Sequence, residues 1–276
     1  MIWFKQLSAI VLSDIKKSRP GRKKGGNMLR LKTLLVLSIA LLFTVNARAV
    51  TLSDAENVFN NYDKDITDLQ KSLDLYDQVI TGTTDQNIIS QAYCDIARTY
   101  LTMGDQAKLT HTDALKDYEA GQAAADKAIK ADPKSAMGYF WYAANIGRVG
   151  QYKGVLNSLF MLPDFKKYLG KAYAIDKNNF NILEAYGEMY YELPWIVGGS
   201  DTKALDYLNA SLKNEPNFTL AMAIIGKVYI KEDKYDKARE ILEKVINYKT
   251  PSFRADWALF DKPLAQRLLD SIKDKK

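Results

Sequence analysis

Three side chains at helical spacing are the first candidates for a binding site. Trp141, Asn145 and Arg148 stand at positions i, i+4 and i+7 of one predicted helix, so they share a helix face. An indole, an amide and a guanidinium side by side in a cavity would suit an acidic substrate, because a guanidinium holds a carboxylate through two parallel hydrogen bonds. Two alternatives stay open: Trp141 packs in the core between helices, or Arg148 forms a salt bridge with a nearby carboxylate.

A second candidate is the segment 192–200, which reads Glu-Leu-Pro-Trp-Ile-Val-Gly-Gly-Ser. Pro194 ends a predicted helix, and the pair Gly198 and Gly199 permits backbone angles that other residues avoid. The turn is five residues longer than the corresponding turn nearer the C-terminus. We therefore expect this loop, with Trp195 as its large apolar side chain, to form the rim of a ligand or partner site. The alternative is a plain turn with a helix cap and a buried tryptophan.

Residue types for catalysis are scarce. The chain holds a single histidine, His111, and a single cysteine, Cys94. These counts exclude a disulfide framework, zinc sites with cysteine and histidine spacing, and any catalytic arrangement that needs more than one imidazole. Carboxylates are numerous but no pair stands in a motif that would assign acid and base roles, and there is no glycine-rich phosphate loop. We expect no catalytic residue, no metal and no cofactor, and the protein is predicted not to be an enzyme.

The net charge does not indicate a nucleic-acid partner. The 276 residues are 47% hydrophobic and 26% charged, as in an ordinary globular protein, with a formal charge of +6. The first 49 residues contain ten basic and one acidic side chain, so 29 basic and 32 acidic side chains remain for the rest. The folded part is therefore slightly acidic, and no nucleic acid is expected to bind it.

The N-terminal residues have the pattern of a secretory signal. After Met28, Arg30 and Lys32 precede an apolar run over 33–45, and Ala47-Arg48-Ala49 follows as a cleavage motif. The run of thirteen residues is shorter than the roughly 20 that a membrane-spanning helix needs. With no cysteine at the cleavage point and no disulfide pair, the sequence predicts release into a bacterial periplasm without a lipid anchor.

This interpretation divides the chain into three parts. Residues 1–27 are either an upstream extension that is not translated or a long start of the signal, 28–49 are the signal peptide, and 50–276 are a single helical-repeat domain.

Apolar residues recur at spacings of three and four after residue 50, and strand-type alternation is missing, so the fold class is all-α. Ser53 and Glu56 have the spacing of a capping box at the first helix. The predicted helices cover 54–80, 86–103, 112–131, 135–148, 153–161, 163–176, 180–192, 201–214, 218–231, 235–247 and 260–273.

The helices fit a tetratricopeptide pattern. Near the C-terminus, Met222, Gly226 and Tyr229 are followed by Ala238 and Pro251, which places small residues where two paired helices cross closely. Three earlier units begin at residues 93, 139 and 183. The sequence thus predicts about four degenerate helix pairs in a superhelix, with 54–80 and 260–273 capping its ends.

Several stretches of the chain resemble a known family. These are residues 141–148, the segment 150–171 with Leu162-Pro163-Asp164, and Leu193-Pro194-Trp195 followed by Gly198-Gly199. They are similar to the T component (TatT-like) of tripartite ATP-independent periplasmic (TRAP) transporters, over roughly residues 86–250. The resemblance implies a tetratricopeptide-like protein with a cavity or pore that works beside the substrate-binding component of the transporter.

Two functions follow as expectations. The first is a periplasmic accessory protein of TRAP-type solute uptake, which binds the substrate-binding component or a small organic acid or apolar ligand. The second is a general protein-interaction scaffold of the cell envelope, because tetratricopeptide superhelices commonly hold peptides on a concave surface. An enclosed apolar cavity would favour the first and an open groove the second, and the oligomeric state is left open.

Overall fold

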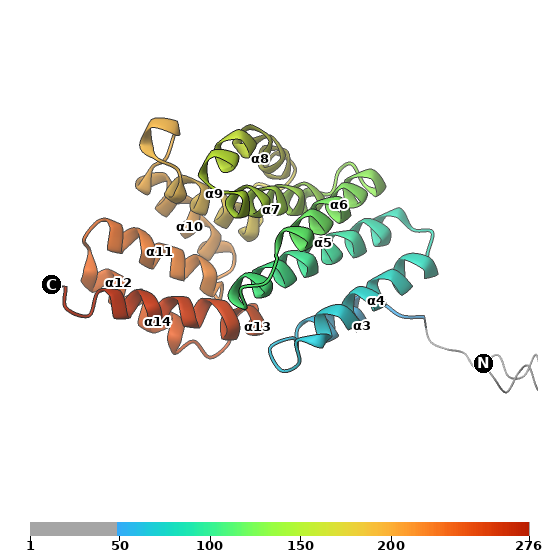
Figure 1. Cartoon of the computed structure of the whole chain (residues 1–276), viewed down its shortest axis with the longest axis horizontal. Coiled ribbons are helices and arrows are strands. Elements are labelled where there is room, and N and C mark those ends of the chain that lie inside the picture. The colour runs from blue at the N-terminus through green and yellow to red at the C-terminus, as the bar shows by residue number, and fades with distance from the viewer. Residues whose placement is uncertain (1–48, 276) are drawn as a thin grey trace, which may run out of the picture. The chain divides into compact units, whose positions relative to one another are not determined.

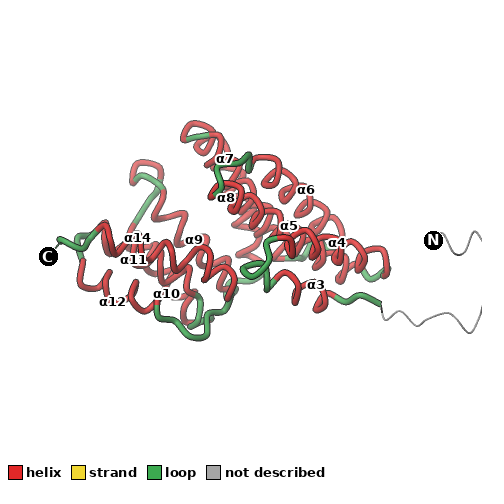
Figure 2. The backbone as a smooth tube through the Cα atoms, turned by 60° about the horizontal axis from the view of Figure 1, so that its bottom comes forward, coloured by secondary structure: helices red, strands yellow, loops and turns green. Residues whose placement is uncertain are grey.

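Antiparallel pairs of short helices make up the part of the chain that the structure describes. The computed structural model describes residues 49–275, which belong to one compact unit. Figure 2 shows helices joined by short loops, without a strand among these residues, which confirms the all-α, tetratricopeptide-like class. None of these helices has both the length and the apolar character needed to cross a bilayer. The predicted extension 1–27 and signal 28–49 lie outside the described residues, except for Ala49.

The helices follow one another in pairs (Figure 1). In chain order they are α3 (Leu52–Phe59), α4 (Thr67–Gly82), α5 (Gln86–Leu109), α6 (Leu115–Ala131), α7 (Ala136–Lys153), α8 (Val155–Ile175), α9 (Phe180–Glu192), η1 (Trp195–Val197), α10 (Asp201–Asn214), α11 (Thr219–Lys231), α12 (Tyr235–Ile246), α13 (Arg254–Asp256), η2 (Trp257–Asp261) and α14 (Lys262–Ser271). The four predicted repeat units correspond to α5–α6, α7–α8, α9–α10 and α11–α12.

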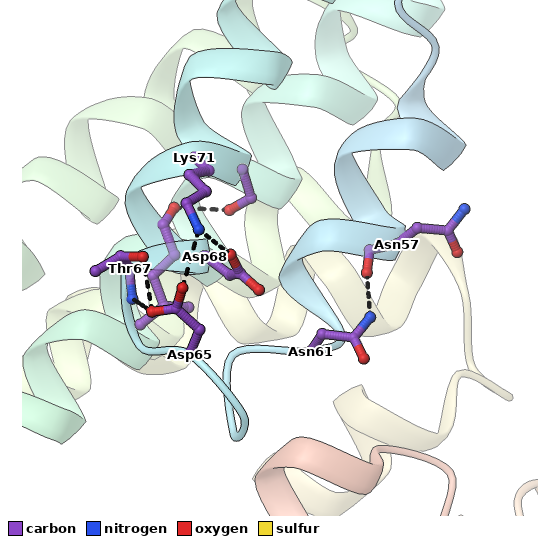
Figure 3. A network of polar contacts seen from close by, with 8 residues as sticks. Asn57, Asn61, Asp65, Thr67, Asp68 and Lys71 are labelled. Atoms are coloured by element: carbon purple, nitrogen blue, oxygen red, sulfur yellow. Dashed lines mark hydrogen bonds and ion pairs between the residues drawn. The ribbon is translucent and has the colours of Figure 1, made fainter.

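The predicted first helix, 54–80, is divided in the structure. Helix α3 begins with Thr51 as its cap, whose Oγ1 accepts from the Asp54 N–H at 3.2 Å, so the capping box expected at Ser53 is wrong. Helix α4 begins after Asp65, whose carboxylate accepts from the Thr67 N–H at 3.0 Å and from Lys71 Nζ at 3.0 Å (Figure 3). Aspartate favours such side-chain-to-backbone turns over helix interiors, and this polar turn separates the two helices.

Of the two predicted interruptions around α7 and α8, the first is displaced to Gly154 and the second is absent. Helix α7 continues to Lys153, and α8 runs through Pro163, where we expected a boundary. A proline inside a helix leaves the carbonyl of the residue four positions earlier, here Leu159, without its N–H donor. Both Leu159 and Pro163 are exposed, so water can satisfy that carbonyl and the helix continues.

Close helix crossings occur at Gly226 and at Gly187, the corresponding glycine of the preceding unit. A Cβ atom on Gly226 would lie 2.5 Å from a Leu242 side-chain carbon, and one on Gly187 would lie 2.5 Å from Leu208. Both leucines are fully buried. Glycine is therefore required here for packing, because any side chain would overlap the second helix of the pair.

The beginning and end of the described chain are in contact. Arg254 in α13 forms an ion pair with Asp63, which follows α3. The guanidinium of Arg98 in α5 lies over the ring of Phe59 at 4.3 Å and over the ring of Phe253 at 4.6 Å from the ring centroids. Cation–π contacts of this kind join three segments that are remote in sequence, and they close the helical array between α3 and α13.

Candidate functional site

The concave side of the helical array encloses one large cavity. Its volume is about 1660 Å³, and it is lined by one face each of α5, α7 and α9, by the first half of α8, and by the C-terminal segment 253–267. In each of the first three pairs, the first helix supplies this lining, as expected for stacked tetratricopeptide units. The cavity combines apolar and charged side chains, and it is the candidate site.

The structure separates the three residues predicted to share a helix face. Trp141 and Arg148 both line the cavity. Asn145 is fully buried and turns away from it, since its Nδ2 donates to the Ala97 carbonyl in α5 at 3.3 Å and to the Trp141 carbonyl at 2.9 Å. A Cβ on Gly121 would lie 2.2 Å from Asn145 Oδ1, so this amide packs where α7 meets α5 and α6.

Trp141 contributes to both the core and the cavity wall. Its ring meets Phe140 edge to face with centroids 4.7 Å apart, and it packs against two hydrophobic clusters. Because the indole is only partly buried, the remaining surface gives the cavity an apolar wall.

Arg148 is already bound to acceptors of the chain. Its Nε lies 3.2 Å from Asp105 Oδ1 and its NH1 donates to Gln151 at 3.1 Å. The carboxylate of Asp105 raises the pKa of the Arg148 guanidinium above its ordinary value. The salt-bridge alternative for Arg148 therefore describes its position in this structure, where Asp105 balances the charge of the guanidinium.

The loop after α9 forms part of the cavity edge. Leu193 and Pro194 line the cavity, whereas Trp195 points outward with 84% of its surface exposed. Gly198 has a φ of +102°, and a Cβ on Gly199 would lie 1.7 Å from the Leu193 carbonyl oxygen, so both positions require glycine.

The backbone N–H groups of this loop are occupied. Gly199 donates to the Pro194 carbonyl at 3.0 Å and Ser200 donates to the Tyr190 carbonyl at 2.9 Å. The Ser200 side chain caps α10 by accepting from Lys203 N–H. The N–H groups of Gly199 and Ser200 are therefore not available to an anion.

Acidic side chains outnumber basic ones in the cavity lining. The acidic residues are Asp95, Asp105, Asp132, Glu184, Glu188, Glu192, Asp256 and Asp261, and the basic residues are Arg98, Lys108, Arg148 and Arg267. A cavity with this balance and low-dielectric walls has a negative potential, which attracts cations.

Three of the acidic residues form a row along α9. Glu184, Glu188 and Glu192 follow at intervals of four, and all three line the cavity. Glu192 accepts from Lys227 Nζ at 2.8 Å. Glu184 is only 6% exposed, and its buried Oε1 has no hydrogen-bond partner among the described residues. Burial, and then the charge of Glu188, raise the pKa of Glu184 well above its ordinary value.

A second buried carboxyl lies at the C-terminal side of the cavity. Asp261 at the end of η2 accepts from the Thr219 hydroxyl at 2.7 Å and is 4% exposed. Burial raises the pKa of Asp261 to about 7, although the Thr219 hydrogen bond acts in the opposite direction. Glu184 and Asp261 interact electrostatically, so the cavity holds two buried carboxyl groups from different ends of the fold.

The two rare reactive residues are poor candidates for chemistry. Cys94 is 4% exposed, and burial raises the pKa of its thiol to about 12, so it is protonated near neutral pH. His111 lies in the turn after α5 with a positive φ of 56°. No group of three histidine, cysteine or acidic side chains in residues 49–275 is arranged to hold a metal ion.

Sequence reasoning missed the carboxyl groups of the cavity. The intervals of four between Glu184, Glu188 and Glu192 were a readable signal, because like charges at this spacing repel on a helix and need a reason to persist. Asp261 offered no such signal, since only the contact between α11 and η2 brings it to the cavity.

The fold and the groove-like cavity define a helical-repeat protein of the tetratricopeptide class. Residues 221–250 match the tetratricopeptide repeat, which is the unit that the sequence pattern placed at Met222. Residues 51–196 match the family described as "Regulator of microtubule dynamics protein 1-3", and since this is more than half of the chain, the protein belongs to that family.

Individual relatives agree with the family match. Regulator of microtubule dynamics protein 1 of Bos taurus is 24% identical over 176 residues, which are 58% of this chain and 53% of the relative. The Mus musculus protein of the same name is also 24% identical, over 58% of this chain and 55% of the relative. The chain therefore spans about half the length of the curated relatives it matches.

A solved structure has the same fold. A thermophilic TPR protein of Thermus thermophilus superposes with a TM-score of 0.56 at 14% identity, over 79% of this chain and 99% of that chain. At this identity the likeness concerns the fold alone.

These findings correct the predicted identity. The resemblance to a TRAP transporter T component is wrong, because residues 141–148 and 193–195, on which it was based, fall inside the match to the regulator family. Solute uptake, a TRAP substrate-binding component as partner and a small organic acid or apolar ligand are contradicted with it. The predicted periplasmic, cell-envelope location is contradicted as well, because the family match gives it no support. The repeat pattern is common to tetratricopeptide proteins, so it did not distinguish these two families.

Proposed function

We propose that this chain is a non-enzymatic protein-interaction module, whose concave cavity binds a segment of a partner protein. The observation that carries the proposal is the single charged and apolar cavity lined by α5, α7 and α9. Superhelices of this class offer such concave surfaces to extended or helical peptides. The names of the relatives describe regulators, which also fits a protein that acts by binding.

The size of the cavity supports a peptide rather than a small solute. Pockets for small molecules typically measure about 300–1,000 Å³. The volume of about 1660 Å³ exceeds that range and would leave a small solute with few contacts. Several residues of a peptide would fill it and bury the apolar wall around Trp141 and Phe165.

The available side chains support binding rather than catalysis. Cys94 is a buried thiol whose pKa is about 12, and His111 belongs to a polar turn. Two pairs of charged groups that line the cavity form ion pairs with each other, Arg148 with Asp105 and Arg98 with Asp256. Such pairs position a bound segment and set its charge preference.

The experiment selects random 12-residue peptides displayed on phage against the full chain, and measures the affinity of the selected peptides by fluorescence anisotropy. Ala144 lines the cavity, whereas Ala123 in α6 is exposed outside it. Ala144→Arg fills the cavity and should weaken binding at least about tenfold, while the matched Ala123→Arg should leave it unchanged. Circular dichroism confirms that both variants fold. If no peptide is selected, or if both variants bind as the wild type does, the proposal is wrong.

A further inference from the structure

The two cations that act on Glu184, in the row of glutamates on α9, are already in ion pairs. Lys227 from α11 is paired with Glu192 at 2.8 Å, and Arg148 from α7 is paired with Asp105 at 3.2 Å. Neither cation is within ion-pair distance of Glu184 or Glu188. Glu184 and Glu188, which both line the cavity, therefore have no ion-pair partner among the described side chains.

Glu184 has a second property that points to an absent partner. Its side chain is more than nine-tenths buried, it lines the cavity, and its Oε1 accepts no hydrogen bond within the described residues. Leaving a buried acceptor without a donor is unfavourable, by about 1–3 kcal/mol for a neutral group and more for a charged one. A native structure tolerates such a group where a ligand supplies the donor.

We infer that Glu184, assisted by Glu188, forms a subsite that binds the cationic side chain of a lysine or arginine in the partner segment. This inference rests on the proposed peptide-binding function and specifies which segments the cavity accepts. An ammonium or guanidinium group supplies both the positive charge and the N–H donors that Glu184 lacks. An acidic side chain at the same place would be repelled by Glu188, because the two cations that act on Glu184, Arg148 and Lys227, are already paired with Asp105 and Glu192.

The protonation of Glu184 agrees with this assignment. Its pKa is raised by burial and by Glu188, so the free cavity stabilises the uncharged carboxyl. A bound cation lowers that pKa and leaves an ion pair that is shielded from water. Close charge pairs of this kind contribute to discrimination between partners more than exposed pairs do.

The test uses peptides from the selection against the full chain, each compared with a version in which its lysine is replaced by norleucine, which keeps the apolar stem and removes the charge. On wild-type protein the replacement should weaken binding at least about tenfold. On Glu184→Gln, which keeps the shape of the side chain, the same replacement should change the affinity less than about twofold. Glu188→Gln is the second variant, with a smaller effect in the same direction. Glu240→Gln is the control, because Glu240 is exposed on α12 outside the cavity.

The outcomes separate the two proposals. If peptides bind the cavity but carry no lysine or arginine, or if norleucine weakens binding equally on wild type and Glu184→Gln, the subsite is refuted and the peptide-binding function stands. If acidic peptides bind best, the subsite is refuted as well. If no peptide binds at all, both proposals are wrong.

Discussion

Tyr62, in the turn after α3, donates its hydroxyl hydrogen bond to Asp256 of α13, which lies 194 residues further along the chain. Asp256 also pairs with Arg98 of α5 at 3.5 Å. The two ends of the described chain are thus connected next to the cavity, which Arg98 and Asp256 both line.

The first prediction concerns this connection. Tyr62→Phe removes the hydroxyl from a side chain that is 1% exposed and leaves Asp256 with one donor fewer. Since the acceptor is charged, the free energy of unfolding should fall by about 1.5–3 kcal/mol, measured by urea denaturation. Tyr235→Phe is the control, because its hydroxyl bonds to Asp233 two residues away at the surface. Equal losses for both variants would contradict the role of the Tyr62 contact.

Most of the helices could be predicted from the sequence, but the contact between Tyr62 and Asp256 could not. Apolar spacing of three and four is a local property, so the pairs α5–α6 to α11–α12 could be predicted from it. The division of 54–80 depended on the polar turn in which the Asp65 carboxylate accepts from the Thr67 N–H. The approach of α3 to α13 depended on side chains nearly 200 positions apart. Local patterns carry no information on such contacts.

The candidate site was predictable in part for the same reason. Trp141 and Arg148 were placed on a cavity by helix periodicity, and Pro194 by the long turn. Asn145 shares their sequence spacing, yet its amide packs against Gly121 in the core and donates to the Ala97 carbonyl. Asp261 enters the cavity only because α11 and η2 pack together.

The second prediction tests the close helix crossing at Gly226. Alanine favours helix interiors by about 0.5–1 kcal/mol over glycine, so Gly82→Ala at the exposed, uncrowded end of α4 should be neutral or stabilising. Gly226→Ala forces its Cβ against Leu242 and should destabilise the protein by about 1–3 kcal/mol. Thermal unfolding measures both. Adding Leu242→Ala to Gly226→Ala should cost less than the sum of the single changes, and strict additivity would show that the two side chains do not meet.

The third prediction uses the buried carboxyl of Asp261. Its pKa is raised from the ordinary value of 3.8 to about 7, mainly by burial, with Asp256 adding to the shift. The folded state thus holds this proton more tightly than the unfolded state does. The stabilisation from Asp261 is complete below about pH 4 and is lost as the pH rises through 7.

Asp261→Asn removes this dependence, because the amide cannot ionise and its oxygen can still accept from Thr219. The free energy of unfolding of Asp261→Asn, relative to wild type, should rise between about pH 4 and pH 7 by at most about 1.4 kcal/mol per pH unit and level off above pH 7. Urea denaturation at a series of pH values measures it. A difference that stays constant with pH would mean that Asp261 is ionised in the folded protein throughout.

The fourth prediction concerns Trp195 at the cavity edge. With 84% of its surface exposed, its truncation removes little burial, so Trp195→Ala should change the free energy of unfolding by less than about 0.5 kcal/mol. It should nevertheless weaken the binding of the selected peptides, since a rim side chain helps to exclude water from the contact. Trp257→Ala is the comparison: this indole is partly buried and donates to the Val245 carbonyl at 2.7 Å, so about 3 kcal/mol should be lost. A large loss of stability for Trp195→Ala with unchanged peptide binding would exclude the rim role.

The central claim is that the concave cavity is where a partner segment binds, and photo-cross-linking tests it most directly. A selected peptide that carries a benzophenone side chain is irradiated with the full wild-type chain, and mass spectrometry identifies the residues to which it becomes attached. We expect attachment at cavity-lining side chains, above all Met161 and Met189, and its loss when excess unlabelled peptide is present. Attachment confined to the outer faces of α10 and α12, with none in the cavity, would contradict the account.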